Sequence, residues 1–129
     1  MEEILYSIFG FLVAVGVLVT VHEWGHYAAA RLVGVRVLKF SIGFGRSVWE
    51  RSWGVDGTTY AIGIVPLGGY VKMFGEGEFL DQSGAPRTLT PSERAISFRH
   101  KSLGARGAIV AAGPGANFLF AVVVFAGVF

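Results

Sequence analysis

Two long stretches of this sequence contain no charged residue, and they limit the folds open to the chain more than any other feature. The first covers 18 residues, 4–21, and the second covers 23 residues, 107–129. At about 1.5 Å per residue, helices of these lengths reach roughly 27 and 35 Å, enough to cross a hydrocarbon core about 30 Å thick. Only 16% of the residues are charged, against about 25% in soluble domains. The sequence therefore predicts two transmembrane helices. The alternative for the first stretch is an apolar helix buried in a soluble protein.

Basic residues are confined to the segment between the two predicted spans. All 11 lysines and arginines lie from Arg31 to Arg106, and six acidic residues in the same segment leave it with a net charge of +5. Because lysine and arginine concentrate at the cytoplasmic ends of spans, we expect residues 34–102 in the cytoplasm and the amino terminus outside. We interpret the positive charge as a sign of topology and of contact with anionic headgroups, with no nucleic acid as partner.

A metal-binding pattern, His22-Glu23-Trp24-Gly25-His26, lies where the first apolar stretch ends. Two histidines four residues apart share one helix face and can bind one metal ion. The glutamate between them projects to one side, where it can act as general base toward a metal-bound water. Titratable side chains are costly in hydrocarbon, so their presence there indicates a function. The pattern predicts Zn²⁺ as cofactor, with His22 and His26 as ligands and Glu23 as the catalytic residue.

The third ligand of a catalytic zinc is not evident in this sequence. There is no cysteine, and the only aspartates, Asp56 and Asp81, lie in glycine-flanked, loop-like segments. Because the sequence stops inside an apolar run at Phe129, we expect a fragment of a longer protein that supplies the missing ligand. Counting along antiparallel spans places Asn117 about level with His22. Its amide can orient a ligand or bond to substrate there, or it can simply join two helices.

The segment between the predicted spans is rich in β-branched and aromatic residues. We expect strands at 35–53 and 58–65, a turn at 54–57, a break at 66–69 and a third short strand at 70–73. Both faces of this sheet are apolar, so it is either buried on both sides or dips toward the membrane. A glycine-rich acidic loop at 75–85 follows, and then a short surface helix capped by Thr90 and reaching about Arg99.

Several sequence runs, in the order in which they occur along the chain, resemble those of the site-2 protease family of intramembrane zinc metalloproteases. The resemblance extends over nearly the whole chain, and the combination of the histidine motif with the run at 66–73 is far more specific than the motif alone. The matching runs are His22-Glu23-Trp24-Gly25-His26, Val35-Arg36-Val37, Phe40-Ser41-Ile42-Gly43-Phe44-Gly45, Pro66-Leu67-Gly68-Gly69-Tyr70-Val71-Lys72-Met73, Lys101-Ser102 and Ala112-Gly113-Pro114-Gly115-Ala116-Asn117-Phe118.

The resemblance implies a zinc endopeptidase of the bacterial inner membrane that cuts transmembrane helices of single-pass proteins, typically anti-sigma factors. It implies that residues 58–73 form a β-hairpin re-entering the membrane and that Gly43, Phe44 and Gly45 lie near the substrate. Tyr70 and Asn117 are further candidates for substrate binding. In the family, PDZ domains follow the second span and an aspartate of a later span completes the zinc site. This sequence ends before both.

The expected fold is an α-helical membrane protein in which two transmembrane helices flank a cytoplasmic or membrane-re-entrant β-hairpin sheet. Its expected parts are the first helix with the metal motif (1–33), a β-rich region (34–74), a cytoplasmic loop with a short surface helix (75–102) and the second helix (103–129). Two other functions stay open: a non-catalytic, zinc-binding membrane scaffold, and a transporter or channel fragment in which histidine and glutamate relay protons.

Overall fold

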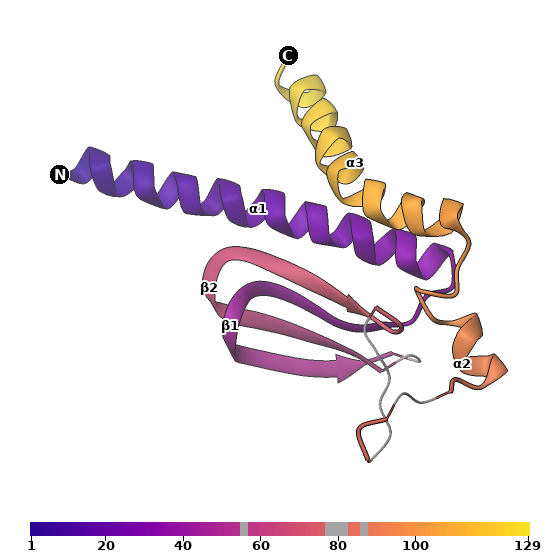
Figure 1. Ribbon diagram of the computed structural model, residues 1–129. Helices are drawn as coiled ribbons and strands as arrows, with labels where there is room; N and C mark the ends of the chain where they lie inside the picture. Colours follow the sequence, from indigo (N-terminus) through magenta and orange to yellow (C-terminus); the bar gives the residue numbers. More distant parts are fainter. Residues whose placement is uncertain (55–56, 77–82, 86–87) are drawn as a thin grey trace.

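The computed structural model describes residues 1–54, 57–76, 83–85 and 88–129. Most of the predicted loop at 75–85, and with it Asp81, lies outside the described residues, as does Asp56. Both long helices and the first strand are found where the sequence predicts them, and the second strand is longer than predicted. In chain order the elements are α1 (Glu2–Leu32), β1 (Val37–Trp53), β2 (Thr58–Met73), α2 (Pro91–Ala95) and α3 (Leu103–Val128). Helix α1 lies between the sheet on one side and α3 on the other (Figure 1).

Helices α1 and α3 are long and apolar enough to cross a membrane. They touch at a point made of small residues, where a side chain on Gly25 would collide with the Ala112 carbonyl and would lie 2.7 Å from the Ala116 Cβ. The first half of α3 runs beside α1 and its second half bends away (Figure 1). Pro114 lies inside α3, and a proline inside a helix causes a bend because it lacks a backbone N–H and crowds the preceding turn.

Strands β1 and β2 pair antiparallel, as Val37 with Met73 and Trp53 with Thr58 illustrate. Both strands bend back near their middles, so the paired segments stand in the order 47–53, 58–63, 37–42 and 69–73. One contact between the strands is an exception to the antiparallel pairing. Residues 39–42 pair with residues 59–62 with both numbers rising together, so these two segments run in the same direction. Gly43 and Gly45 have φ angles of +89° and +78°, which glycine adopts without a steric cost. They form the bend in β1.

This sheet corrects two expectations. Residues 66–69 do not break the strand, because β2 is continuous from Thr58 to Met73 and the predicted third strand is its second half. Residues 58–73 are also not a hairpin paired with itself, because 37–42 of β1 lies between the two halves of β2. Pro66 and the glycines after it indicate a bend in the chain. They do not indicate which distant segment of the sequence lies between the two halves of β2.

A small core joins the base of the helices to the sheet. It contains Ala30 of α1, Val35, Val37, Met73 and Ile109 of α3, all at most 9% exposed. Next to it, α2 begins with the predicted cap: the Thr90 hydroxyl accepts the Glu93 N–H at 3.2 Å, and the Glu93 carboxylate accepts the Thr90 N–H at 3.1 Å. The helix ends at Ala95, before the predicted Arg99, because the backbone at Ile96 and Phe98 bonds instead to Arg36 and Phe74.

Candidate metal centre

The two histidines of α1 face each other across one helical turn. Their Nε2 atoms lie 3.1 Å apart, and their rings meet edge to face at 4.7 Å between centroids. Two nitrogens that share a tetrahedral zinc at about 2.0–2.1 Å lie roughly 3.3 Å from each other. The observed separation is compatible with two nitrogens that share one zinc ion, as the sequence predicts for His22 and His26. No third histidine, cysteine, aspartate or glutamate joins them among the described residues.

A backbone carbonyl of α3 sets the orientation of His26. The Nδ1 atom of His26 lies 2.7 Å from the Ile109 oxygen. A carbonyl only accepts hydrogen bonds, so Nδ1 carries the proton and donates it. The lone pair of the imidazole is then on Nε2, the nitrogen that faces His22. Ligating histidines are commonly oriented by such a second partner, and here it comes from a residue 83 positions later in the chain.

Asn117 of α3 stands beside the other histidine, as the depth estimate predicts. Its Nδ2 is 3.5 Å from Nδ1 of His22, and its Oδ1 is buried with no hydrogen-bond partner. Rotating the amide by half a turn exchanges these two atoms, and the orientation of an amide is assigned from its hydrogen-bond partners. In that orientation Oδ1 accepts the Nδ1 proton of His22, and the Nε2 lone pair becomes available to a metal. The rotated amide pairs its oxygen with the His22 imidazole and places its NH2 group at the buried position.

A glycine of α3 leaves the space in which the two imidazoles meet. A side chain on Gly113 would collide with Nε2 of His26 and lie 2.8 Å from Nε2 of His22. The neighbouring Gly115 has nothing within 4 Å of the same position. Position 113 therefore has no room for a side chain beside the two imidazoles, while position 115 does.

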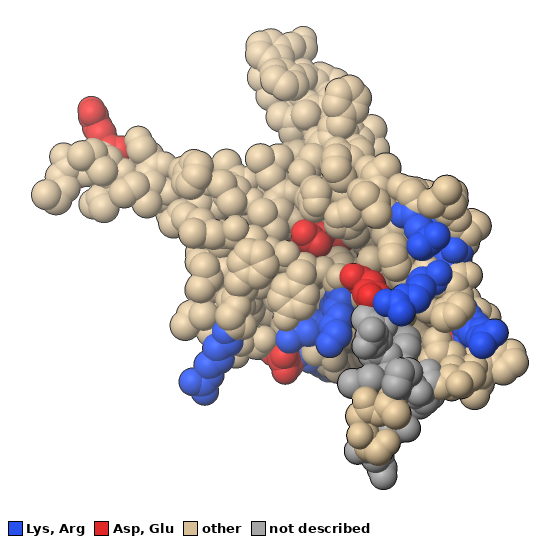
Figure 2. All heavy atoms as spheres, in the orientation of Figure 1, with Lys and Arg blue, Asp and Glu red and all other residues tan. Residues whose placement is uncertain are grey.

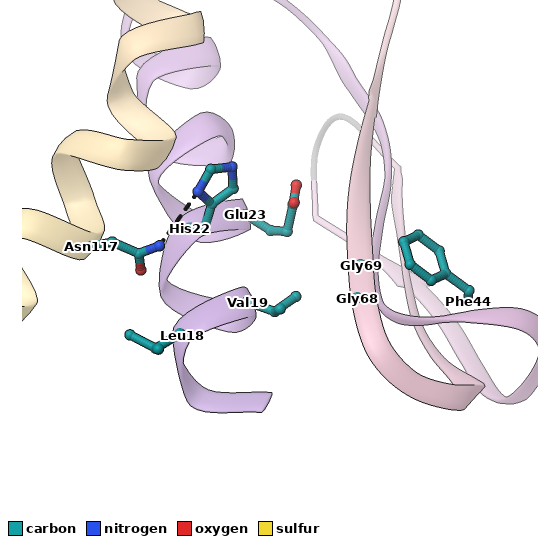
Figure 3. Close-up of a pocket in the computed structure, with 8 residues that line it drawn as sticks. All are labelled: Leu18, Val19, His22, Glu23, Phe44, Gly68, Gly69 and Asn117. Atoms are coloured by element: carbon teal, nitrogen blue, oxygen red, sulfur yellow. Dashed lines mark hydrogen bonds between the residues drawn. The ribbon is translucent and has the colours of Figure 1, made fainter. Parts of the chain in front are cut away.

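Glu23 projects from α1 toward β2, away from Asn117 (Figure 3). Beside it lies a cavity of about 350 Å³, lined by Leu18, Val19, His22, Glu23, Phe44, Gly68, Gly69 and Asn117. A second cavity of about 280 Å³ continues along residues 69–73 and is lined by Glu23, His26 and the far residue Glu76, among others. Residues 69–73 form the outer segment of the sheet among the described residues, so the carboxylate faces this sheet edge across the two cavities.

The remaining predicted site residues divide into two groups. Phe44 lines the cavity that contains His22 and Glu23, and its ring stacks nearly parallel on Tyr70, with centroids 6.4 Å apart. Tyr70 lines the second cavity, next to Glu23. Gly43 and Gly45 line neither of these cavities. They shape the bend that carries Phe44 over Gly68, where any side chain would collide with the Phe44 ring.

Comparison with known protein families shows to which family the chain belongs. The family described as "Peptidase family M50" matches residues 10–129. This chain belongs to peptidase family M50. The match confirms the resemblance to site-2 proteases that the sequence runs predict.

Three relatives show how far the likeness to M50 proteins extends. The regulator of sigma-E protease RseP of Escherichia coli is 49% identical over 125 residues, and its counterpart in Salmonella typhimurium is 48% identical. A protein of Vibrio cholerae named as a zinc metalloprotease is 47% identical. Each match covers 97% of this chain but 26% of the relative. The chain therefore spans about a quarter of the length of these M50 relatives.

Two contributors to the M50 site were missed in the sequence. Ile109 acts through its backbone oxygen, which leaves no trace in the identity of its side chain. In the sequence, Gly113 stands out only as part of the run at 112–118 that carries the family resemblance. Its position four residues before Asn117 offered a usable signal, because residues four apart share one helix face. If Asn117 faces the metal ligands, Gly113 faces them too.

Proposed function

We propose that this chain is the metal-binding part of an intramembrane zinc metalloendopeptidase. The observation that carries the proposal is the pair of Nε2 atoms 3.1 Å apart on an apolar helix, with Glu23 directed from the same turn toward an open strand edge. Membership of family M50 supports it. The third ligand comes from outside the described residues, in the complete protein.

The proposed location is the bacterial inner membrane, crossed by α1 and α3. Apart from Glu2 and Glu3, their outer parts carry no charged side chain, and Lys and Arg gather around the sheet and the base of the helices (Figure 2). With Glu2 and Glu3 at the other end of α1, the positive-inside rule puts the amino terminus outside and the β-rich segment at the cytoplasmic side. Large apolar residues of the sheet, such as Val48, Ile64 and Leu67, are more than half exposed, which favours a sheet that dips into the membrane.

The proposed chemistry divides between the metal and Glu23. When bound by His22 and His26, zinc supplies an acidified water and polarises the scissile carbonyl. Glu23 accepts the proton from the attacking water and later delivers it to the leaving amine. Asn117 and the Ile109 carbonyl hold the two imidazoles in the tautomer that ligation requires. The apolar surroundings strengthen these interactions, because few waters compete for them.

The proposed substrate is a transmembrane segment of a single-pass membrane protein, held extended along residues 69–73. A helix cannot be cut while its peptide groups bond to one another, and a sheet edge offers replacement partners by strand addition. Relatives named as regulators of sigma-E protease favour an anti-sigma-factor-like substrate. Phe44 and Tyr70 would contact its side chains.

Replacing Val71 by proline should impair cleavage with zinc still bound. The Phe74 N–H bonds to Arg36 of the sheet and the Met73 N–H bonds to Glu76, so alternation directs the Val71 N–H outward, to the open edge. Proline removes that donor. We expect at least a tenfold fall in cleavage rate of a reconstituted substrate, whereas Val71→Ala, which keeps the N–H, should retain most activity. Equal rates for the two variants would contradict strand addition at this edge.

Asn117→Leu should weaken zinc binding by about 10- to 100-fold, the usual effect of removing a group that orients a ligand. Leucine keeps the volume of the side chain and loses the hydrogen bond to His22. Zinc titration monitored by metal analysis measures the affinity, and excess zinc should restore turnover. Unchanged zinc affinity with lowered turnover would move Asn117 from the ligand to the substrate.

The proposed function is tested most directly by removing the metal from the complete protein in lipid vesicles. Chelation should abolish cleavage of a single-pass substrate, and one equivalent of Zn²⁺ per protein should restore it. A proton-relay function needs no stoichiometric zinc. Protein that binds no zinc even when it is supplied in excess would overturn the proposal.

A further inference from the structure

A row of four residues crosses the face of the sheet that is turned away from α1. Each of the four paired segments contributes one member, and the row consists of Glu50, Ala61, Ser41 and Tyr70, each paired with the next. Residues paired in this way point to one face of a sheet. The opposite face meets α1, because a side chain on Gly69, the neighbour of Tyr70, would lie 3.1 Å from a methyl carbon of Val19. We call the face that carries the row the outer face.

Lys39 connects the two ends of this row. It lies two residues before Ser41 in β1, so its side chain is on the outer face as well. Its Nζ lies 3.1 Å from Oε1 of Glu50 and 5.7 Å from the centre of the Tyr70 ring. A hydrogen bond to Tyr70 and a second to Glu50 raise the pKa of the Lys39 ammonium. One ammonium group therefore contacts side chains of the first and the last segment of the row.

The middle of the row is made of small, buried side chains. Ser41 is 2% exposed and Ala61 is 3% exposed. The Ser41 hydroxyl donates to the Gly43 carbonyl at 3.0 Å, so it has a partner of its own. Small side chains at these two positions leave the room that the long side chain of Lys39 needs to reach both ends. Glu50 is held from its own segment too, because the Ser47 hydroxyl donates to the same Oε1 at 3.2 Å.

The Tyr70 end of the row lies in residues 69–73, along which the proposed function places the substrate. The Tyr70 ring stacks on Phe44 at an angle of 6° between the ring planes, and Phe44 is 44% exposed. A substrate strand added at this edge would direct every second side chain to the outer face. One of these side chains would stand opposite Tyr70, beside the two rings. The place that Tyr70 occupies thus shapes this contact.

We propose that Lys39, held by Glu50, is a positioning residue that fixes Tyr70 against Phe44 and so selects a large apolar side chain of the substrate at the outer face. This inference rests on the proposed function, because it requires a substrate strand along residues 69–73. Without the ammonium, Tyr70 keeps its stack on Phe44 but gains freedom to leave it. The contact then distinguishes less well between a large and a small side chain.

The test uses the complete, zinc-loaded protein in lipid vesicles and a panel of single-pass substrates in which one position at a time is changed from leucine to alanine. One position, opposite Tyr70, should show a preference for leucine. Lys39→Met keeps the length of the side chain and loses its charge, so it should lower this preference about threefold, through KM. The two flanking positions, which face α1, and the zinc content should not change. Lys39→Arg should keep the preference.

Two further variants control for general damage to the sheet. Arg46→Met also removes a positive charge, at an exposed position of β1, and should leave every preference as it is. Glu50→Gln leaves Lys39 in place but weakens its hold, so it should lower the same preference by a smaller factor.

A double substitution separates positioning from a general structural effect. In a Tyr70→Leu protein, Lys39→Met should have no further effect on the preference, because the residue through which it acts is gone. Additive effects of these two substitutions, or equal slowing of all substrates by Lys39→Met, would overturn the proposal. An unchanged leucine preference in Lys39→Met would remove only the positioning role. A zinc-loaded wild-type protein that cleaves no member of the panel would overturn the proposed function, and this inference with it.

Discussion

Glu23→Gln should lower peptide cleavage by about 10²- to 10⁴-fold, the usual contribution of a general base, while one zinc per protein remains bound. Glutamine has nearly the same size and keeps an oxygen at the same place, but it cannot accept the proton of the attacking water. Neither imidazole depends on Glu23, because their partners are Ile109 and Asn117. Cleavage assays and metal analysis on the same preparation therefore separate catalysis from ligation.

The matched control for this variant is Glu76→Gln. Glu76 lines the same cavity as Glu23, but its carboxylate accepts the Met73 N–H at 2.7 Å, and a glutamine oxygen can do the same. This variant should keep most of its activity. A zinc-loaded Glu23→Gln protein that still cleaves would instead favour a scaffold whose metal is structural, the first alternative that the sequence leaves open.

Gly113→Ala should remove zinc from the protein with little change in helix content. The added methyl group would occupy the space between the two imidazoles, at 2.8 Å from Nε2 of His22 and closer still to His26. We expect zinc affinity to fall by more than the roughly 100-fold that marks the loss of a supporting group. Alanine is a better helix former than glycine, so α3 itself should persist, which circular dichroism can check.

Gly115→Ala provides the comparison for this substitution. It makes the same chemical change two residues away, where nothing lies within 4 Å, and it should bind zinc and cleave normally. Full zinc occupancy in Gly113→Ala would mean that α3 stands farther from α1 in the complete protein than in the present structure.

The two long helices and the proximity of the two histidines were predictable because their signals are local. Apolar length identifies α1 and α3, a four-residue spacing brings His22 and His26 together, and Thr90 with Glu93 forms a cap within four residues of chain. Depth counting from Arg31 and Arg106 also led to Asn117, because rise per residue is constant in a helix. Each of these inferences needs only the geometry of a single element.

The order of the paired segments in the sheet and the contacts that orient the two imidazoles were not predictable, because they depend on pairing between distant segments. Nothing in residues 37–42 indicates that both halves of β2 will lie beside them. The early end of α2 has the same origin, since Arg36 and Phe74 compete for its backbone groups. No sequence pattern can single out the Ile109 carbonyl, because every residue has a backbone carbonyl.

The orientation of both imidazoles by α3 has a consequence for biosynthesis. Their partners follow 83 and 95 positions later, so a nascent chain that has released only its first helix carries the histidines without the groups that steer them. The rings then rotate freely, and neither nitrogen is reserved for a metal. Under the proposed function, zinc binding by these two histidines therefore waits until the later helix docks against the first.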